Sequence, residues 1–340
     1  MSDPVPGCVV AVDGGGSKTH AVALTIDGEL AGRGHGPGSS PHVSGVPQSI
    51  EIVDAAVRAA IEAASAGGTD EVAQANIYLS GLDLPPELDE YADAAAALPW
   101  TSPTTVVDND LFALLRTGTE SPDAVAVVCG TGVNAIGVRS AGPAGPAAAA
   151  RFAALGPISG DWGGGSGLGE EALWHAARAE DGRGPETALR AVVLAGMGVA
   201  SVSELTQDLH FGRRQLPDLA VLAPGVLEAA RNGDAIAGTI VDRQAAEVVA
   251  FARASLTRLG MLDREVPVVL GGGVIRAADE RLIAGIIAGL AEAAPLARAV
   301  LLDSPPIVGA GLLALEAAGA TPAAVERART ELTAAYSREL

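Results

Sequence analysis

The sequence has few cysteines and few basic residues, and each shortage excludes a class of protein. The two cysteines, Cys8 and Cys129, lie far apart in separate apolar runs. This spacing fits neither a disulfide framework nor paired metal ligands. Acidic residues outnumber basic ones 41 to 22, and no run of Lys or Arg occurs. A nucleic-acid partner is therefore not expected, because the chain would repel a phosphate backbone.

Membrane anchors and secretion signals are also missing from the sequence. No window reaches the ~18 uncharged apolar residues of a membrane span, and the N-terminus lacks the basic region and apolar stretch of a signal peptide. We therefore expect a soluble, cytoplasmic protein with no membrane partner. Lysine is rare as well, because Lys18 is the single lysine of the chain. Its position is informative for that reason.

Apolar residues are plentiful enough for a large core. Hydrophobic residues make up 49% of the 340 residues and charged residues 19%, which excludes low-hydrophobicity disorder. A chain of this length predicts two domains, because a single core stops growing at about 250 to 300 residues.

Strand and helix patterns alternate through the first part of the chain. Residues 8–12 form an apolar run and residues 20–26 alternate in side-chain size, as is typical of strands. Asp27-Gly28 predicts a hairpin turn into a third strand, and apolar residues from Val46 to Ile61 recur at helical spacing. Further strands are expected at 76–80 and 104–108, with a helix introduced between them by Pro85 and Pro86.

The second part of the chain repeats this organisation. Apolar runs at 124–129 and 133–138 flank a short loop, as at the N-terminus, so two copies of one supersecondary unit are implied. The low-complexity segment 141–150 predicts a surface loop or hairpin tip. The remaining expected elements are helices within 166–262, a strand entering glycines at 266–273, and helices at 307–319 and 322–336. The predicted fold class is α/β.

A glycine-rich loop, Asp13-Gly14-Gly15-Gly16-Ser17-Lys18-Thr19, lies between the first two expected strands. Glycines let successive N–H groups turn toward an anion, and the Ser, Lys and Thr side chains add donors. The alternative is a tight hairpin, which would gain nothing from the adjacent Asp and Lys. A P-loop or a dinucleotide fingerprint would open a helix, whereas a strand follows here. We therefore interpret the segment as a phosphate-binding loop.

Two further glycine loops, Gly130-Thr131-Gly132 and Gly271-Gly272-Gly273, also end expected strands. Each by itself is compatible with a simple turn. Their order raises their significance, because three glycine-rich loops then end strands in two repeated halves. This arrangement predicts contacts with phosphates and with a nucleoside.

Aspartates stand at the start of two expected helices. Asp108 and Asp110 follow a strand, where open α/β sheets place their ligands. There a carboxylate can act as a base or cap the helix that begins at Leu111, and both alternatives remain open for these two residues. Asp161 lies in the glycine-rich segment 160–166 ahead of a helix, with a capped helix start as the alternative.

Together these segments resemble the BadF/BadG/BcrA/BcrD ATPase family, and within it the N-acetylglucosamine kinase branch of the actin-like sugar kinase and Hsp70 superfamily. The matching segments are AVDGGGSKT at 11–19 and CGTGVNAIG at 129–137 for phosphate, SGL at 80–82 and NDLFALLRTGT at 109–119 for the catalytic connection, GDWGGGSG at 160–167 for sugar, and LGGG at 270–273 for adenosine. The resemblance implies two ribonuclease-H-like (actin-like ATPase) domains flanking a cleft. The implied boundaries are 1–116, 117–320 with a helical insertion, and a C-terminal helix at 321–340 packing back on the first domain.

The resemblance also implies a magnesium- and ATP-dependent kinase acting on the 6-hydroxyl of an amino sugar, and we expect a homodimer. Asp110 matches the family's base better than Asp108, because the family places this aspartate after Asn or Thr, and Asp13 would orient the hydration shell of Mg²⁺. The residues implied to contact ATP and its phosphates are Gly15, Gly16, Ser17, Lys18, Thr19, Thr131, Gly132, Gly271 and Gly272. The residues implied to contact the sugar are Ser40, Ser80, Gly81, Asn134 and Asp161.

Two departures from the family pattern lie on the sugar side. The amino-sugar kinases usually carry Asn where Ser40 stands and Glu where Trp162 stands. A serine hydroxyl reaches less far than an amide and offers fewer fixed hydrogen bonds. The expected acceptor is N-acetylglucosamine, followed by glucosamine and then N-acetylmuramic acid.

Two other functions remain open within the superfamily. ATP-driven activators of CoA-ester dehydratases and reductases hold an iron–sulfur cluster through cysteines, but Cys8 is expected inside a strand and leaves only Cys129. A non-catalytic sugar sensor is the other alternative. We expect no helix-turn-helix segment ahead of the first strand, and the phosphate loops with Asp110 favour an enzyme.

Overall fold

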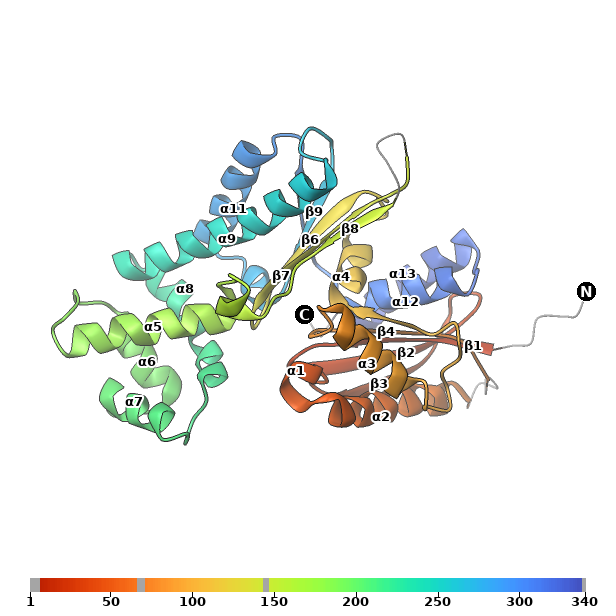
Figure 1. Cartoon of the computed structure of the whole chain (residues 1–340), viewed down its shortest axis with the longest axis horizontal. Helices are drawn as coiled ribbons and strands as arrows, with labels where there is room; N and C mark the ends of the chain where they lie inside the picture. Colours follow the sequence, from red (N-terminus) through yellow and green to blue (C-terminus); the bar gives the residue numbers. More distant parts are fainter. Residues whose placement is uncertain (1–6, 66–70, 143–146, 338–340) are drawn as a thin grey trace, which may run out of the picture. The chain divides into compact units, whose positions relative to one another are not determined.

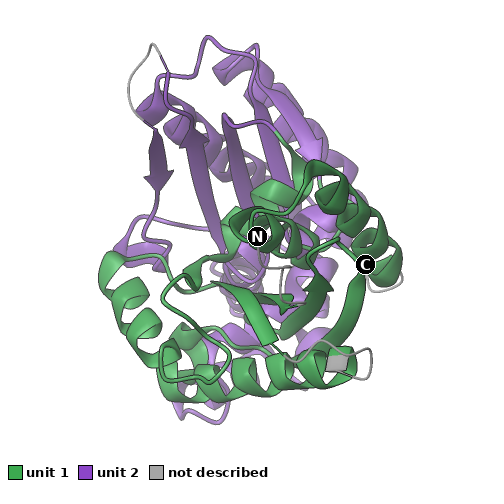
Figure 2. Cartoon of the chain, turned by 90° about the vertical axis from the view of Figure 1, so that its right-hand side faces the viewer, with its two compact units in different colours: residues 1–120, 302–340 green, residues 121–301 purple. Residues whose placement is uncertain are grey.

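The computed structural model describes residues 7–65, 71–142 and 147–337, which form two compact units (Figures 1 and 2). Unit 1 comprises the chain up to Glu120 together with the segment from Leu302 onward, and unit 2 comprises Ser121–Leu301. The first change of unit falls close to the boundary expected after residue 116. The segment 302–320, expected in the second domain, lies instead in unit 1.

Unit 1 is built on a five-stranded sheet with the order β3-β2-β1-β4-β5. The β1–β2 and β2–β3 pairs are antiparallel, whereas the β1–β4 and β4–β5 pairs are parallel. The strands are β1 (Gly7–Gly14), β2 (Lys18–Thr25), β3 (Leu30–Pro37), β4 (Glu71–Leu79) and β5 (Val106–Asn109). The helices are α1 (Pro41–Ser44), α2 (Val46–Ser65), α3 (Pro85–Ala95), α4 (Asp110–Gly118), α12 (Ile307–Ala317) and α13 (Pro322–Tyr336).

Both faces of the unit 1 sheet are covered by helices. Successive side chains of a strand point to opposite faces, so Val10 and Val12 join the apolar cluster under α2, while Val9 and Ala11 join the cluster formed with α12 and α13. Figure 1 shows α2 on one side of the strands and α12 with α13 on the other. The segment 302–320 therefore belongs to unit 1, because α12 completes the second face of its sheet.

Unit 2 contains a second five-stranded sheet with the order β10-β9-β6-β7-β8. Its strands are β6 (Ala124–Cys129), β7 (Val133–Arg139), β8 (Ala148–Arg151), β9 (Pro267–Gly271) and β10 (Arg298–Leu301). Its helices are η1 (Gly156–Ile158), α5 (Gly164–Glu180), α6 (Leu189–Met197), α7 (Val202–His210), η2 (Leu216–Leu222), α8 (Ala223–Arg231), α9 (Ala235–Leu259), α10 (Gly273–Arg276) and α11 (Glu280–Ala293). In chain order the two sheets have one topology, which confirms the expected repeat.

Two strands of unit 2 differ from expectation. Ala148, Ala149 and Ala150 lie in the segment 141–150 predicted as a loop or hairpin tip, but with Arg151 they form β8, which pairs antiparallel with β7. Residues 143–146 of that segment lie outside the described part of the chain. No strand was predicted at β10 either, because three of the four residues of this edge strand are exposed and its side chains lack an alternating pattern.

Across the described residues, no single helix has both the length and the apolar composition to cross a membrane, although α6 and α7 together meet these criteria as a bent pair. Leu189, Val193 and Met197 of α6 are buried in the core of unit 2.

Candidate active site

The first glycine loop joins β1 to β2 and is held by backbone hydrogen bonds. Gly15 N–H donates to the Lys18 carbonyl at 2.9 Å, and Ser39 N–H donates to the Gly15 carbonyl at 3.0 Å. Ser80 N–H donates to the Gly14 carbonyl at 2.9 Å, so the segments after β3 and β4 both lie against the loop. Its outer residues, Gly16, Ser17 and Lys18, are exposed and can meet a ligand.

Thr19 has a different place from the one implied by the resemblance. It is fully buried, and its hydroxyl lies 2.6 Å from the Pro37 carbonyl oxygen and 2.8 Å from Ser39 Oγ. These two contacts use the donor of the hydroxyl inside the protein. Thr19 therefore supports the loop from beneath and does not present its hydroxyl to a phosphate.

The helix that begins after β5 is capped by Asn109, a residue that the sequence left out of the choice between Asp108 and Asp110. The Asn109 side chain accepts a hydrogen bond from Leu111 N–H at 3.0 Å, and its amide donates to Asp83 Oδ1 at 2.9 Å. Asp108 Oδ1 accepts from Asn109 N–H at 2.7 Å. Neither aspartate is the cap, so Asp110 at the first helical position remains available for chemistry.

Three carboxyl groups interact electrostatically near the start of α4. Burial raises the pKa of Asp110 well above its usual value, and the negative charges of Asp13 and Asp83 raise it further. Hydrogen bonds from backbone N–H groups act in the opposite direction but are outweighed. A carboxyl group with a raised pKa is a better proton acceptor once ionised, as general-base catalysis requires.

The sugar-side residues predicted in unit 1 lie together. Gly81 has φ +80°, which favours glycine, and a Cβ at this position would lie 2.8 Å from Ser40 Oγ and 3.0 Å from His42 Cγ. Ser40 is buried and Ser80 is half-buried. The structure thus groups Ser40 and Gly81 with His42, whose Nε2 lies 2.7 Å from Glu87 Oε1.

Sequence reasoning missed His42 and Glu87. A local signal existed for Glu87, because a Glu at the third position of a helix that begins with Pro85 often accepts hydrogen bonds from the preceding backbone. No local signal connects it with His42, which lies on another element. Only the packing of α1 against the start of α3 brings the two side chains together.

The second glycine loop, in unit 2, connects β6 to β7 and contacts the start of α5. Gly165 N–H donates to the Gly130 carbonyl at 2.7 Å, and Ser166 N–H donates to the Thr131 carbonyl at 2.9 Å. Gly164 has φ +70°, and a Cβ there would lie 2.5 Å from the carbonyl carbon of Gly132. Thr131 and Gly132 are exposed, so the loop has a supported inner side and an open outer side.

The third glycine loop follows β9, and its three glycines differ in their surroundings. Gly271 is buried in the strand. Gly272 has φ +96°, and a Cβ there would collide with the backbone of Cys129. Gly273 is exposed, and open space lies where its side chain would be. Gly272 is therefore required by packing, while the residue with room for a ligand is Gly273, which the sequence did not select.

The remaining predicted sugar residues, Asn134 and Asp161, belong to unit 2. Asn134 Oδ1 accepts from Ala135 N–H at 2.7 Å. Asp161 Oδ2 accepts from the Ser159 hydroxyl at 2.5 Å in the segment between η1 and α5. The neighbouring Trp162 stacks under Arg243, whose guanidinium carbon is 3.9 Å from the ring centroid, so this residue has a packing partner.

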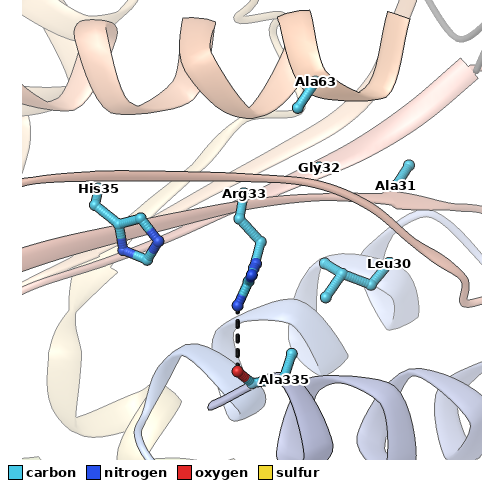
Figure 3. Close-up of a pocket in the computed structure, with 7 residues that line it drawn as sticks. All are labelled: Leu30, Ala31, Gly32, Arg33, His35, Ala63 and Ala335. Carbon is cyan, nitrogen blue, oxygen red and sulfur yellow. Dashed lines mark hydrogen bonds between the residues drawn. The ribbon is translucent and has the colours of Figure 1, made fainter. Parts of the chain in front are cut away.

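A pocket at the edge of the unit 1 sheet is separate from these residues (Figure 3). It has a volume of about 510 Å³ and is lined by β3, by Ala63 of α2 and by Ala335 of α13. Arg33 Nη1 donates to the Ala335 carbonyl at 3.2 Å within it. None of the predicted site residues lines this pocket, so we do not assign it to the active site.

The sequence profile of the BadF/BadG/BcrA/BcrD ATPase family matches residues 10–314. The chain belongs to this family. The family assignment made from the motifs is confirmed, and the glycine loops and aspartates described above all lie within the matched range.

Two curated proteins are similar to this chain over most of their length. The chain is 28% identical over 317 residues to the N-acetyl-D-glucosamine kinase of Dictyostelium discoideum, covering 90% of this chain and 97% of that protein. It is 26% identical over 267 residues to the N-acetylmuramic acid/N-acetylglucosamine kinase of Clostridium acetobutylicum, covering 78% and 85%.

Solved structures confirm the predicted α/β fold. A Chromobacterium violaceum protein solved as a candidate N-acetylglucosamine kinase has a TM-score of 0.70 and 24% identity, with 92% of this chain and 100% of that chain covered. A glucokinase of the ROK family from Streptomyces griseus, solved with glucose and AMPPNP, has a TM-score of 0.54 and 17% identity, with 95% and 100% covered.

Proposed function

We propose that the protein is an ATP-dependent kinase that phosphorylates the 6-hydroxyl of an amino sugar, N-acetylglucosamine or glucosamine. The observation that carries this proposal is Asp110 at the first position of α4, which leaves the cap to Asn109 and has its pKa raised by burial and by Asp13 and Asp83. Both curated relatives named above are kinases of N-acetylated amino sugars. We further propose that it acts in the cytoplasm as a homodimer.

The proposed reaction assigns a separate task to each group. Asp110 accepts the proton of the attacking hydroxyl. General-base catalysis of this kind raises the reaction rate by ~10²- to 10⁴-fold. The exposed residues Gly16, Ser17 and Lys18 bind donor phosphate, with Thr131 and Gly132 of unit 2 contributing further contacts. Ser40, Ser80, Gly81, Asn134 and Asp161 contact the sugar, and Gly271, Gly272 and Gly273 lie near the adenosine. Phosphoryl transfer depends mainly on such positioning and on charge neutralisation.

The carboxylates of unit 1 fit a magnesium ion. Asp13 and Asp83 raise the pKa of Asp110 through their negative charge, and a divalent cation would relieve that repulsion. Hard oxygen donors such as carboxylates are the ligands that Mg²⁺ prefers. We propose that Asp13 holds the hydration shell of the ion, which when bound to ATP would neutralise phosphate charge.

The test is a coupled assay of ADP release with Mg-ATP and a panel of acceptors: N-acetylglucosamine, glucosamine, N-acetylmuramic acid and glucose. We expect the two glucosamines to be used with higher kcat/KM than glucose, and the product to be the 6-phosphate by NMR. ADP release with none of the sugars, or equal efficiency on glucose, would contradict the proposed acceptor.

The alternative of an iron–sulfur activator is disfavoured by both thiols. Cys8 and Cys129 are fully buried, and burial raises the pKa of the Cys129 thiol to about 12. Cys8 and Cys129 lie in separate apolar clusters, one in each unit, so neither sulfur is presented at a surface where cysteines could hold an iron–sulfur cluster. Iron analysis of the purified protein distinguishes the two functions.

A further inference from the structure

We propose that His42 accepts a hydrogen bond from a ring hydroxyl of the acceptor sugar. Glu87 holds the imidazole in the tautomer that can accept this bond. This inference rests on the proposed sugar kinase function and specifies one of its contacts. It assigns a specificity-determining role to His42 and a positioning role to Glu87.

The location of His42 is fixed by Gly81. A Cβ built on Gly81 would lie 3.0 Å from Cγ and 3.3 Å from Cδ2 of the His42 ring, closer than most side chains allow. The missing side chain of Gly81 therefore makes room for the imidazole beside Ser40. The Cγ–Cδ2 edge of the ring faces Gly81, which leaves Nδ1 and Nε2 for other partners.

Glu87 determines which ring nitrogen carries a proton. His42 Nε2 lies 2.7 Å from Glu87 Oε1, and an ionised carboxylate only accepts hydrogen bonds, so Nε2 is the donor. Burial would raise the pKa of Glu87, but hydrogen bonds from Leu84, His42 and Asp83 outweigh burial and hold the pKa below its usual value. Glu87 is thus a fixed, ionised acceptor.

The consequence is an acceptor nitrogen on the other side of the ring. In a neutral imidazole with hydrogen on Nε2, Nδ1 accepts. Within the described ranges Nδ1 of His42 has no hydrogen-bond partner, and 34% of the side chain is exposed. A fixed acceptor beside Ser40 and Gly81 matches the O–H donor of a sugar ring, and a site built for a hydroxyl rejects analogues that lack it.

A divalent cation fits the same side chains less well. His42, Asp83 and Glu87 each offer a ligand atom, and these atoms lie within 4.8 Å of one another. Glu87 Oε2 already accepts from Leu84 N–H at 2.8 Å and from Asp83 N–H at 2.9 Å. Asp83 Oδ1 accepts from Asn109 at 2.9 Å. A cation would compete with these hydrogen bonds and with the contact between His42 Nε2 and Glu87 Oε1, so the arrangement favours the orientation of His42.

Asp83 connects this group to the proposed base. It is buried, it shares a hydrogen bond with Asn109, and its charge raises the pKa of Asp110. The hydroxyl that donates to His42 would therefore belong to the same sugar whose 6-hydroxyl faces Asp110.

The test measures coupling between His42 and individual hydroxyls. Wild type, His42→Leu and His42→Gln are assayed with N-acetylglucosamine and with its 3-deoxy and 4-deoxy analogues. For one analogue the wild type should lose about fivefold to tenfold in kcat/KM, the usual value of one hydrogen bond. His42→Leu should show the same loss on the parent sugar and no further loss on that analogue, while His42→Gln, which keeps an acceptor oxygen, should lie between them.

Glu87→Gln tests the positioning role. Its amide can donate to Nε2, which permits the other tautomer, so coupling to the same hydroxyl should fall while the KM for ATP stays unchanged. His210→Gln, an exposed histidine of α7 in unit 2, is the matched control and should behave as wild type.

Separate outcomes decide the two proposals. If the wild type phosphorylates no sugar, the proposed function is wrong and this inference fails with it. If the wild type is active but every deoxy analogue loses the same factor in wild type and in both His42 variants, His42 does not contact the sugar and only this inference is wrong.

Discussion

The two sheets of the protein have one strand topology but different groups at the ends of their strands. In unit 1, Asp13 lies near the end of β1, and Asp83 and Asp110 follow β4 and β5. In unit 2, β6 ends at Cys129 and β9 at Gly271. The repeated scaffold therefore presents carboxylates in one unit and mainly glycine loops with backbone N–H groups in the other.

Burial raises the pKa of a key side chain in both units, but the chemical result differs. In unit 2, burial raises the pKa of Cys129 to about 12, and the neutral thiol packs as an apolar side chain. In unit 1, burial raises the pKa of Asp110 beside two other carboxylates, which creates a site suited to protons and cations. The topology supplies the position, and the residue at that position supplies the chemistry.

The largest expected effect comes from removing the unit 1 base. Asp110→Asn should lower kcat by ~10²- to 10⁴-fold, because the amide cannot accept the proton of the hydroxyl. Nucleotide affinity should remain nearly unchanged in a binding titration. Steady-state kinetics measures the first effect.

Asp108→Asn is the matched control, because Asp108 precedes the cap residue and its Oδ1 accepts from Asn109 N–H. It should cost far less than Asp110→Asn. A larger loss of kcat in Asp108→Asn than in Asp110→Asn would identify Asp108 as the base. It would also contradict the description of the unit 1 carboxylates given above.

The next effect concerns the glycines of the two units. Gly272→Ala places a Cβ against the Cys129 backbone at φ +96° and should cost about 1 to 3 kcal/mol of unfolding free energy. Gly16→Ala, where a Cβ meets no atom within 4 Å, should stay within about 0.5 kcal/mol. Urea unfolding measures both, and equal costs would show that the unit 2 loop is not the more crowded one.

Lys18→Ala should have a smaller effect, confined to the donor. Lys18 is exposed on the first glycine loop, whose outer residues we propose to bind the donor phosphate, and a single ammonium suits a point contact with phosphate. Its loss should raise the KM for ATP by about tenfold, as for one charge-assisted hydrogen bond, and leave the KM for the sugar unchanged. An unaltered KM for ATP would indicate that Lys18 does not contact the phosphate and that backbone N–H groups bind it instead.

The smallest expected effect is a pH-dependent change in stability. Because the folded-state pKa of Asp110 is raised, the folded state binds its proton more tightly, and stability falls as pH rises above the unfolded value of about 3.9. Asp110→Asn lacks this loss, so its Tm should exceed that of wild type by about 2 °C at pH 8. The two should coincide at about pH 3.5, below the unfolded value. A difference independent of pH would argue against a raised pKa.

The sequence predicted the features that depend on short stretches of chain. The strands and loops around Gly15 and Gly130, the helix spacing from Val46 and the repeated order of elements were all visible. Each is encoded by side-chain periodicity or by glycine within a few residues. These local patterns also carried the resemblance that led to the family.

Residues that act through distant neighbours were not visible. Thr19 as an internal support and Gly273 as the open glycine each depend on which atoms another segment brings near, whereas the cap formed by Asn109 is a local contact with Leu111 N–H that the sequence could have indicated. A threonine or a glycine has the same one-letter code whether it faces solvent or a carbonyl group of another segment. The sequence could therefore propose donors but could not separate supporting residues from exposed ones.

The sequence by itself determined the alternation of strands and helices, the glycine loops and the placement of aspartates after strands, because these follow from local backbone preferences. Only the tertiary structure decided that α12 completes the sheet of unit 1 and that His42 meets Glu87 beside Gly81. The tertiary structure also decided that the charges of Asp13 and Asp83 act on Asp110. The physical reason is that burial and charge interactions depend on distances in space, which chain separation does not specify.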